Sequence, residues 1–375
     1  MRIKSIDFLR GIAILLVLCR HMEYTAVTHL IGWCGVDLFF VLSGFLVSGL
    51  LFKEYKENNN LQPLLFLIRR GFKIYPMFWG VLIIIIVTHY FTGFGTSKQA
   101  LMAELLFYQN YSTHTLLSTT WSLAVEEHFY ILLIAGVSLA VKYNVLLNSR
   151  GFHYVVGSVL LFCLLARIVT SIVHPQYNFL VHYAPTHLRI DALTFGVILA
   201  YNYHFNAVWF TLFFNRYRYY IIAAVVVFLA PVFLYDAHTV YMRTIGFSFV
   251  YLGFGGLISL MLCVSQVSIT LQKILSKHLY SLVSTIGYYS YAIYLFHTQI
   301  VIGLAKLGNY VSIVTTNNHV QFGCYLLLSI LSGTALTYLI ERPALATRQY
   351  YFAAGTNLSL RWRIQWPYVP QVQFA

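Results

Sequence analysis

Charged residues are scarce in this 375-residue chain. Asp, Glu, Lys and Arg together make up 9% of it, and 11 residues are acidic. Soluble globular domains carry about 25% charged residues, so the composition excludes an ordinary soluble domain. Hydrophobic residues account for 59%, which is typical of a polytopic membrane protein.

Several common functional signatures are missing as well. The five cysteines are scattered, without metal-ligand or disulfide spacing, which favours a role as small packing residues. There is no Walker loop, GxGxxG or HExxH motif, and no internal repeat of the kind found in many transporters. We therefore expect no metal site and no tightly bound cofactor.

Ten apolar stretches are long enough to cross a bilayer. Their residues are 6–24, 34–52, 76–92, 119–141, 154–173, 187–203, 219–235, 244–264, 282–305 and 322–340. With the N-terminus in the cytoplasm, 17 of the 24 Lys and Arg residues fall in inner segments, 3 in outer segments and 4 within spans. This split follows the positive-inside rule. The net charge of +13 therefore indicates membrane orientation and no nucleic-acid partner.

The predicted fold is all-α, a polytopic membrane protein with about ten transmembrane helices enclosing a polar central site. Both termini are expected in the cytoplasm. Residues 1–345 are expected to form the membrane domain, and residues 346–375 a cytoplasmic C-terminal tail. The largest inner loop is expected at 53–75, because it begins with KEYKENNN and ends with the basic IRRGFKIYP.

The first apolar stretch carries Arg10 and His21, eleven residues apart. On a helix this spacing leaves a residual rotation of about 20°, so both side chains share one face, roughly 16 Å apart along the axis. Ionisable groups inside a span are costly and by default mark a functional site. Asp7 could simply pair with Arg10 at the i,i+3 spacing, and Arg20 suits an interface position.

The other polar groups of the spans divide by depth. Arg10, Arg69, Arg70 and Lys73 belong to the inner side, where a cationic mouth suits a cytosolic phosphate-bearing donor. A second set lies in the outer half, where a histidine and carboxylates suit general-base work on a hydroxyl. This set comprises His21, Asp37, Glu126, Glu127, Arg189, Asp191 and His297, with the two glutamates shortly after Trp121.

Some of these positions also have plain structural interpretations. Glu126 and Glu127 are 100° apart on a helix, so Glu126 is the better functional candidate and Glu127 suits a helix–helix strut. Arg167 suits a structural role as well as a functional one. A membrane histidine is often a packing residue, but His297 follows Ser290 and Tyr294 on one polar stripe.

The motifs reached so far resemble those of the membrane acyltransferase-3 family. They occur in the family's order over residues 1 to about 345: LRGIAILLVLCRH, GVDLFFVLSGFL, RRGFKIYP, TTWSLAVEEHFY, LRIDALTFGVIL, YSYAIYLFHT and a closing ERP. In two places the chain departs from the family pattern. Lys73 stands where the family commonly has arginine, which keeps the charge but not the bidentate fork. His128 replaces the glutamine of VEEQFY.

The resemblance implies a membrane O-acyltransferase that moves an acetyl or other acyl group from cytosolic acetyl-CoA to a hydroxyl. A cell-surface glycan or lipid-linked saccharide, such as lipopolysaccharide O-antigen or exopolysaccharide, would be the acceptor, and a bacterial cytoplasmic membrane the location. The catalytic candidates are His21, Arg10, Glu126 and Asp37. Arg69, Arg70 and Lys73 would bind the donor, and Arg189, Asp191, Trp121, Tyr294 and His297 the acceptor.

A transporter or glycan exporter, with the buried charges as a proton relay, is the alternative. The inner basic cluster distinguishes the two functions, because a proton-coupled carrier does not need it. Whether an acyl-enzyme forms, with Ser43 or Tyr294 as carrier, stays open.

Overall fold

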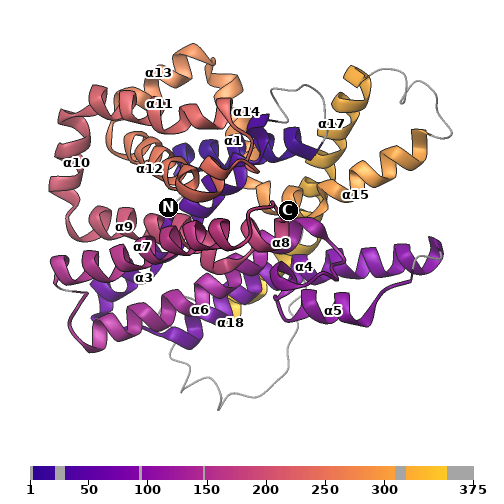
Figure 1. Ribbon diagram of the computed structural model, residues 1–375, viewed down its shortest axis with the longest axis horizontal. Coiled ribbons are helices and arrows are strands. Elements are labelled where there is room, and N and C mark those ends of the chain that lie inside the picture. Colours follow the sequence, from indigo (N-terminus) through magenta and orange to yellow (C-terminus); the bar gives the residue numbers. More distant parts are fainter. Residues whose placement is uncertain (1–2, 22–29, 93–94, 147, 309–317, 353–375) are drawn as a thin grey trace.

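The computed structural model describes residues 3–21, 30–92, 95–146, 148–308 and 318–352, and within these ranges the chain is helical without strands. Figure 1 shows the arrangement. The elements are α1 (Lys4–His21), α3 (Cys34–Asn58), α4 (Pro63–Thr92), α5 (Lys98–Leu105), η1 (Gln109–Tyr111), η2 (Ser118–Thr120), α6 (Trp121–Lys142), α7 (Ser149–Val173), α8 (Phe179–His182), α9 (Thr186–Phe205), α10 (Ala207–Arg216), α11 (Arg218–Leu234), η3 (Met242–Gly246), α12 (Phe247–Cys263), α13 (Ser265–Ile274), α14 (Lys277–Tyr288), α15 (Ser290–Gly308), α17 (Asn318–Leu336), η4 (Thr337–Glu341) and α18 (Arg342–Tyr351).

Six helices of the described residues are long and apolar enough to cross a membrane, or seven if α10 and α11 form one span bent by 81°. The bend is visible in Figure 1, where α10 runs across the direction of α11. The expected stretch 282–305 is not one helix, because it is interrupted between α14 and α15. In the first stretch the structure describes a helix from Lys4 to His21, and residues 22–24 lie outside the described residues. The count of ten spans stays a prediction.

The expected inner loop at 53–75 is wrong. α3 continues to Asn58 and α4 begins at Pro63, so the basic segment forms the first half of a 30-residue helix. Hydropathy marks where a helix meets lipid, whereas backbone hydrogen bonding continues beyond that point. Pro76 lies inside α4 without ending it, as membrane helices often allow.

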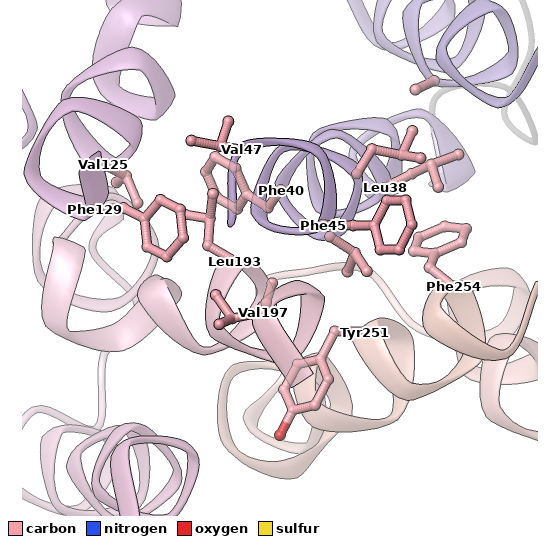
Figure 2. Packing of buried hydrophobic residues seen from close by; sticks show 14 of the residues in the cluster. Leu38, Phe40, Phe45, Val47, Val125, Phe129, Leu193, Val197, Tyr251 and Phe254 are labelled. Carbon is pink, nitrogen blue, oxygen red and sulfur yellow. The ribbon is translucent and has the colours of Figure 1, made fainter. Parts of the chain in front are cut away.

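The main core is built around α3. Figure 2 shows Phe40 and Phe45 of α3 among side chains from α6, α9 and α12. Phe40 is 1% exposed and Leu193 of α9 is fully buried. Large side chains in contact on four helices fix their relative positions, and these helices carry much of the polar site.

Two helix pairs approach so closely that only glycine fits. A Cβ on Gly287 of α14 would collide with the carbonyl oxygen of Asp7 and with the backbone of Gly11 on α1. Gly44 of α3 meets α9 at Gly196 in the same way. Small residues at crossings are a common packing device in membranes. The crossing at Gly287 fixes α1, which carries Arg10 and His21, against α14.

The C-terminal helix α18 packs against α4. It begins at Arg342, directly after the π-helical turn η4. Residues 353–375, most of the expected tail, lie outside the described residues. The expected division at residue 345 falls inside α18 and stays a prediction.

Candidate active site

A cavity of about 150 Å³ lies where α1, α3, α4, α6 and α15 meet. Three cations from two helices line it: Arg10, Arg70 and Lys73. The acidic residue of this lining is Glu126. We call this space the inner cavity. Its excess positive charge and arginine forks suit a phosphate group or another anion.

Glu126 is connected to Ser43 through Tyr130. The Tyr130 hydroxyl donates to Glu126 Oε2 at 2.7 Å, and Ser43 Oγ lies 3.0 Å from the same hydroxyl. Because Tyr130 has one hydrogen to donate, Ser43 donates to Tyr130. The Arg70 guanidinium lies 5.8 Å from the centroid of the Tyr130 ring, close enough for a cation–π contact. The carboxylate is thus held and oriented inside the cavity.

Lys73 is held by an acidic residue near the C-terminal end of the described residues. Its ammonium group forms an ion pair with Glu341 at the end of η4 and lies 5.9 Å from the Tyr291 ring centroid. Tyr291 in turn donates to the backbone oxygen of Ile74 at 2.8 Å. The side chain of Lys73 is therefore fixed in the wall of the inner cavity.

A second cavity of about 290 Å³, the outer cavity, contains His21. Its lining is rich in aromatic side chains and comes from segments at the expected outer ends of the helices: Trp33, Trp121, Tyr177, Phe179 and Tyr183. Arg20 also lines it and lies 3.7 Å from Asp236, which is also 3.3 Å from His238. Aromatic faces with a few polar groups are typical of a site for an organic ligand.

Tyr294 and Val36 line both cavities. The Tyr294 hydroxyl donates to the backbone oxygen of Thr119 at 2.8 Å, so Ser122 Oγ, 2.6 Å away, donates to Tyr294. These bonds fix the Tyr294 ring where the two cavities adjoin.

Three predicted site residues belong to a buried ion-pair network and not to either lining. Arg189 Nη2 donates to Asp37 Oδ1 at 2.7 Å, and Asp191 is paired with Arg167 at 2.5 Å. Arg167 also donates to the backbone oxygen of Leu188, which agrees with a structural role. Breaking a buried pair typically costs about 3–5 kcal/mol.

Arg189 nevertheless touches the wall of the outer cavity. Its guanidinium lies 4.6 Å from the Tyr183 ring centroid and 5.7 Å from that of Trp121. Both rings line the cavity. The network can therefore orient the aromatic wall without itself contacting a ligand.

Two other predicted residues also lie outside both linings. Arg69 Nε donates to the backbone oxygen of Phe352 at 2.9 Å, so it contacts the end of α18. His297 is fully buried beside His21.

Glu127 accepts from Tyr75 of α4 at 3.0 Å, which agrees with a helix–helix strut. No group of three or more His, Cys, Asp or Glu that could hold a metal ion exists among the described residues.

Sequence reasoning missed several contributors. Glu341 was noted as part of a motif, but its partner Lys73 is 268 residues away, so no local pattern could pair them. Trp33, Tyr177 and His238 face the outer cavity, yet aromatic residues at span ends are common in all membrane proteins. Tyr130 was not missed, since it follows Glu126 by four residues on one helix face and the sequence places the two side chains together.

Glu104 of α5 supports the site from outside the spans. It is fully buried, accepts from Thr120 Oγ1 at 2.7 Å and from the Leu117 backbone N–H at 3.2 Å. Burial raises the pKa of this carboxyl to about 7. The segment that it holds contains Thr119, whose backbone oxygen anchors Tyr294.

Glu104→Gln should flatten the pH dependence of stability. The raised pKa means that folding favours the protonated acid, so this contribution is complete below about pH 4.5 and is lost as pH rises through 7. The loss should reach about 3 kcal/mol. Glutamine can accept from Leu117 and donate to Thr120 at any pH. Thermal unfolding midpoints in detergent, from pH 5 to 8, should therefore converge at low pH and separate at high pH. Parallel curves would contradict this role.

The described residues thus form apolar helices long enough to cross a membrane, with a cation-lined cavity and a cavity that contains His21 next to each other. Residues 3–338 match the family model described as "Acyltransferase domain". The chain belongs to this acyltransferase-3 family.

Curated relatives agree with that assignment. The peptidoglycan O-acetyltransferase OatA of Listeria monocytogenes is 26% identical over 157 residues, which cover 38% of this chain and 25% of the relative. The Bacillus subtilis protein named "Putative peptidoglycan O-acetyltransferase YrhL" is 29% identical over 181 residues, 43% of this chain and 27% of the relative. The chain thus spans about a quarter of the length of these relatives. No solved structure matches it.

Proposed function

We propose that this protein transfers an acetyl group from cytosolic acetyl-CoA to a hydroxyl of a cell-surface glycan across the bacterial cytoplasmic membrane. The observation that carries the proposal is the pair of adjoining cavities. One is lined by Arg10, Arg70 and Lys73, and the other by His21. Such a division suits an anionic donor on one side and a hydroxyl acceptor on the other.

The donor side uses charge. Coenzyme A carries several phosphates, and arginine and lysine are the side chains that bind them best. Arg70 and Lys73 belong to the half of α4 that the charge distribution assigns to the cytoplasm. The long flexible arm of coenzyme A between phosphates and thioester could then extend along α1, whose Arg10 and His21 are roughly 16 Å apart.

The acceptor side uses a base and aromatic surfaces. His21 takes the proton of the acceptor hydroxyl while the oxygen attacks the thioester carbonyl, and the proton passes on to the departing thiolate. The products are the acetyl ester and free coenzyme A, so no further reactant is needed. Trp121 and Tyr183 offer flat faces to a sugar ring. Asp37, Arg189 and Asp191 act from behind that wall, and Glu126 acts in the inner cavity.

The names of the relatives support one acceptor class as the first to test. OatA is a peptidoglycan O-acetyltransferase by name, so peptidoglycan is the first acceptor to test, ahead of lipopolysaccharide O-antigen and exopolysaccharide. Each offers sugar hydroxyls that a neutral histidine can deprotonate during attack.

The test uses inside-out membrane vesicles, whose outer face is the cytoplasmic one. Acetyl-labelled acetyl-CoA is supplied outside and soluble peptidoglycan fragments are enclosed inside. We expect labelled ester inside and free coenzyme A outside, without an ion gradient. Vesicles lacking the protein serve as the control. Transfer that requires permeabilised vesicles, or no transfer at all, would refute the sided arrangement.

Arg70→Ala should weaken coenzyme A binding by about 1.5–3 kcal/mol, the usual effect of one lost charge-assisted contact. Lys73→Arg should keep or improve binding, because the charge remains and a fork is added. Arg69→Ala is the matched comparison. The Arg69 side chain is adjacent in sequence to Arg70 but contacts Phe352 instead of the cavity. Titration of coenzyme A measures all three. Equal losses in Arg69→Ala and Arg70→Ala would place the phosphates outside the inner cavity.

A further inference from the structure

His297 of α15 is fully buried although it carries a titratable ring. Its exposed fraction is 0%, and neither cavity includes it in the lining. Its ring centroid lies 4.7 Å from that of His21, with 59° between the ring planes. The ring therefore contacts the histidine of the outer cavity and is shielded from any ligand.

One hydrogen bond determines which nitrogen of His297 is protonated. Nδ1 lies 2.6 Å from the backbone oxygen of Tyr294. A carbonyl oxygen only accepts, so Nδ1 carries the hydrogen, and Nε2 of the neutral ring is an acceptor. Among the described residues this buried Nε2 has no hydrogen-bond partner. A hydrogen-bond acceptor, Nε2 of His297, is thus held beside His21.

Apolar side chains pack between the two helices that carry the pair. Ile14, Val17 and Leu18 of α1 form one cluster with Ile293 of α15. Hydrogen bonds in such surroundings are stronger than in water, and an unpaired polar group is costly there. A contact between the two imidazoles would satisfy Nε2 and hold the His21 ring in one orientation.

We infer that His297 is a positioning residue for His21. An N–H of the His21 ring donates to Nε2 of His297 after a small rotation of the touching rings. This bond fixes the tautomer of His21 and leaves its other nitrogen as the base that faces the outer cavity. The role, which rests on the proposed function, parallels that of the buried aspartate that orients the histidine in a serine protease triad.

Two substitutions separate this role from simple packing. His297→Gln places a side-chain oxygen near the position of Nε2, whereas His297→Phe keeps a flat ring without an acceptor. The assay measures coenzyme A release from acetyl-CoA, with soluble peptidoglycan fragments as the acceptor. We expect His297→Phe to lower kcat by about 100-fold with an unchanged KM for acetyl-CoA. His297→Gln should retain most of the activity.

A packing role predicts the reverse order, because phenylalanine suits an apolar site better than a buried amide does. Thermal unfolding midpoints of both variants report that packing separately. Wild-type kcat in His297→Phe, or an equal loss of kcat in His297→Gln, would overturn the inference. Neither result would bear on the role of His21 as the base, which His21→Ala tests separately. If the wild-type protein releases no coenzyme A, the proposed function fails and the inference falls with it.

Discussion

His21→Ala should lower the rate of acetyl transfer by about 10²–10⁴-fold, the usual contribution of a general base, while the protein still inserts and folds. The reason is local. His21 is the last residue of α1, it is exposed and it lines the outer cavity, so its removal leaves the helix core intact. Affinity for coenzyme A should stay the same, because the inner cavity is unchanged. Single-turnover transfer in vesicles and coenzyme A titration measure the two effects.

His278→Ala is the matched control for His21→Ala. His278 is exposed on α14 and lies in neither cavity lining, so this variant should keep full activity. Near-wild-type transfer by His21→Ala would exclude the catalytic role. A parallel loss of donor binding would instead indicate damage that extends to the inner cavity.

Gly287→Ala should prevent the normal assembly of α1 with α14. The added methyl carbon would overlap the carbonyl oxygen of Asp7, a backbone atom that cannot move without the helix. Overpacking of this kind costs about 1–3 kcal/mol where a core can adjust, and backbone contact allows less adjustment. We expect a lower thermal midpoint in detergent. Transfer should fall as well, because a displaced α1 carries both Arg10 and His21 out of place.

Gly136→Ala provides the comparison for the same chemical change. A Cβ on Gly136 of α6 meets nothing within 4 Å. In a helix, alanine is favoured over glycine by up to about 1 kcal/mol, so this variant should be neutral or slightly more stable. Equal stability of Gly287→Ala and Gly136→Ala would contradict the close crossing of α1 and α14.

Helical periodicity was sufficient to predict part of the candidate site from the sequence alone. The spacing of Arg10 and His21 placed them on one face at two depths, and the structure places one in each cavity. Contacts between helices were out of reach, because they depend on how neighbouring helices are rotated. Arg189 was predicted to contact the acceptor, yet its partner Asp37 is 152 residues away and both are buried.

The sequence also predicted the ends of helices poorly. The basic segment around Arg70 resembled a loop because it is polar, but it continues as α4 and turns its charges into a cavity. Charged side chains lower the hydropathy of a segment without disturbing its backbone bonds. A sequence pattern therefore locates the apolar part of a membrane helix better than its ends.

The position of Val36 and Tyr294, which line both cavities, has a consequence for the cell's energy supply. A bacterium stores free energy as a proton gradient across its cytoplasmic membrane, worth about 2.3 kcal/mol per charge for each 100 mV. A continuous water-filled passage between a cytosolic donor site and an external acceptor site would discharge it. In the proposed function this passage holds the arm of coenzyme A, so the Tyr294 ring, which Thr119 and Ser122 fix in position, would have to close against that arm.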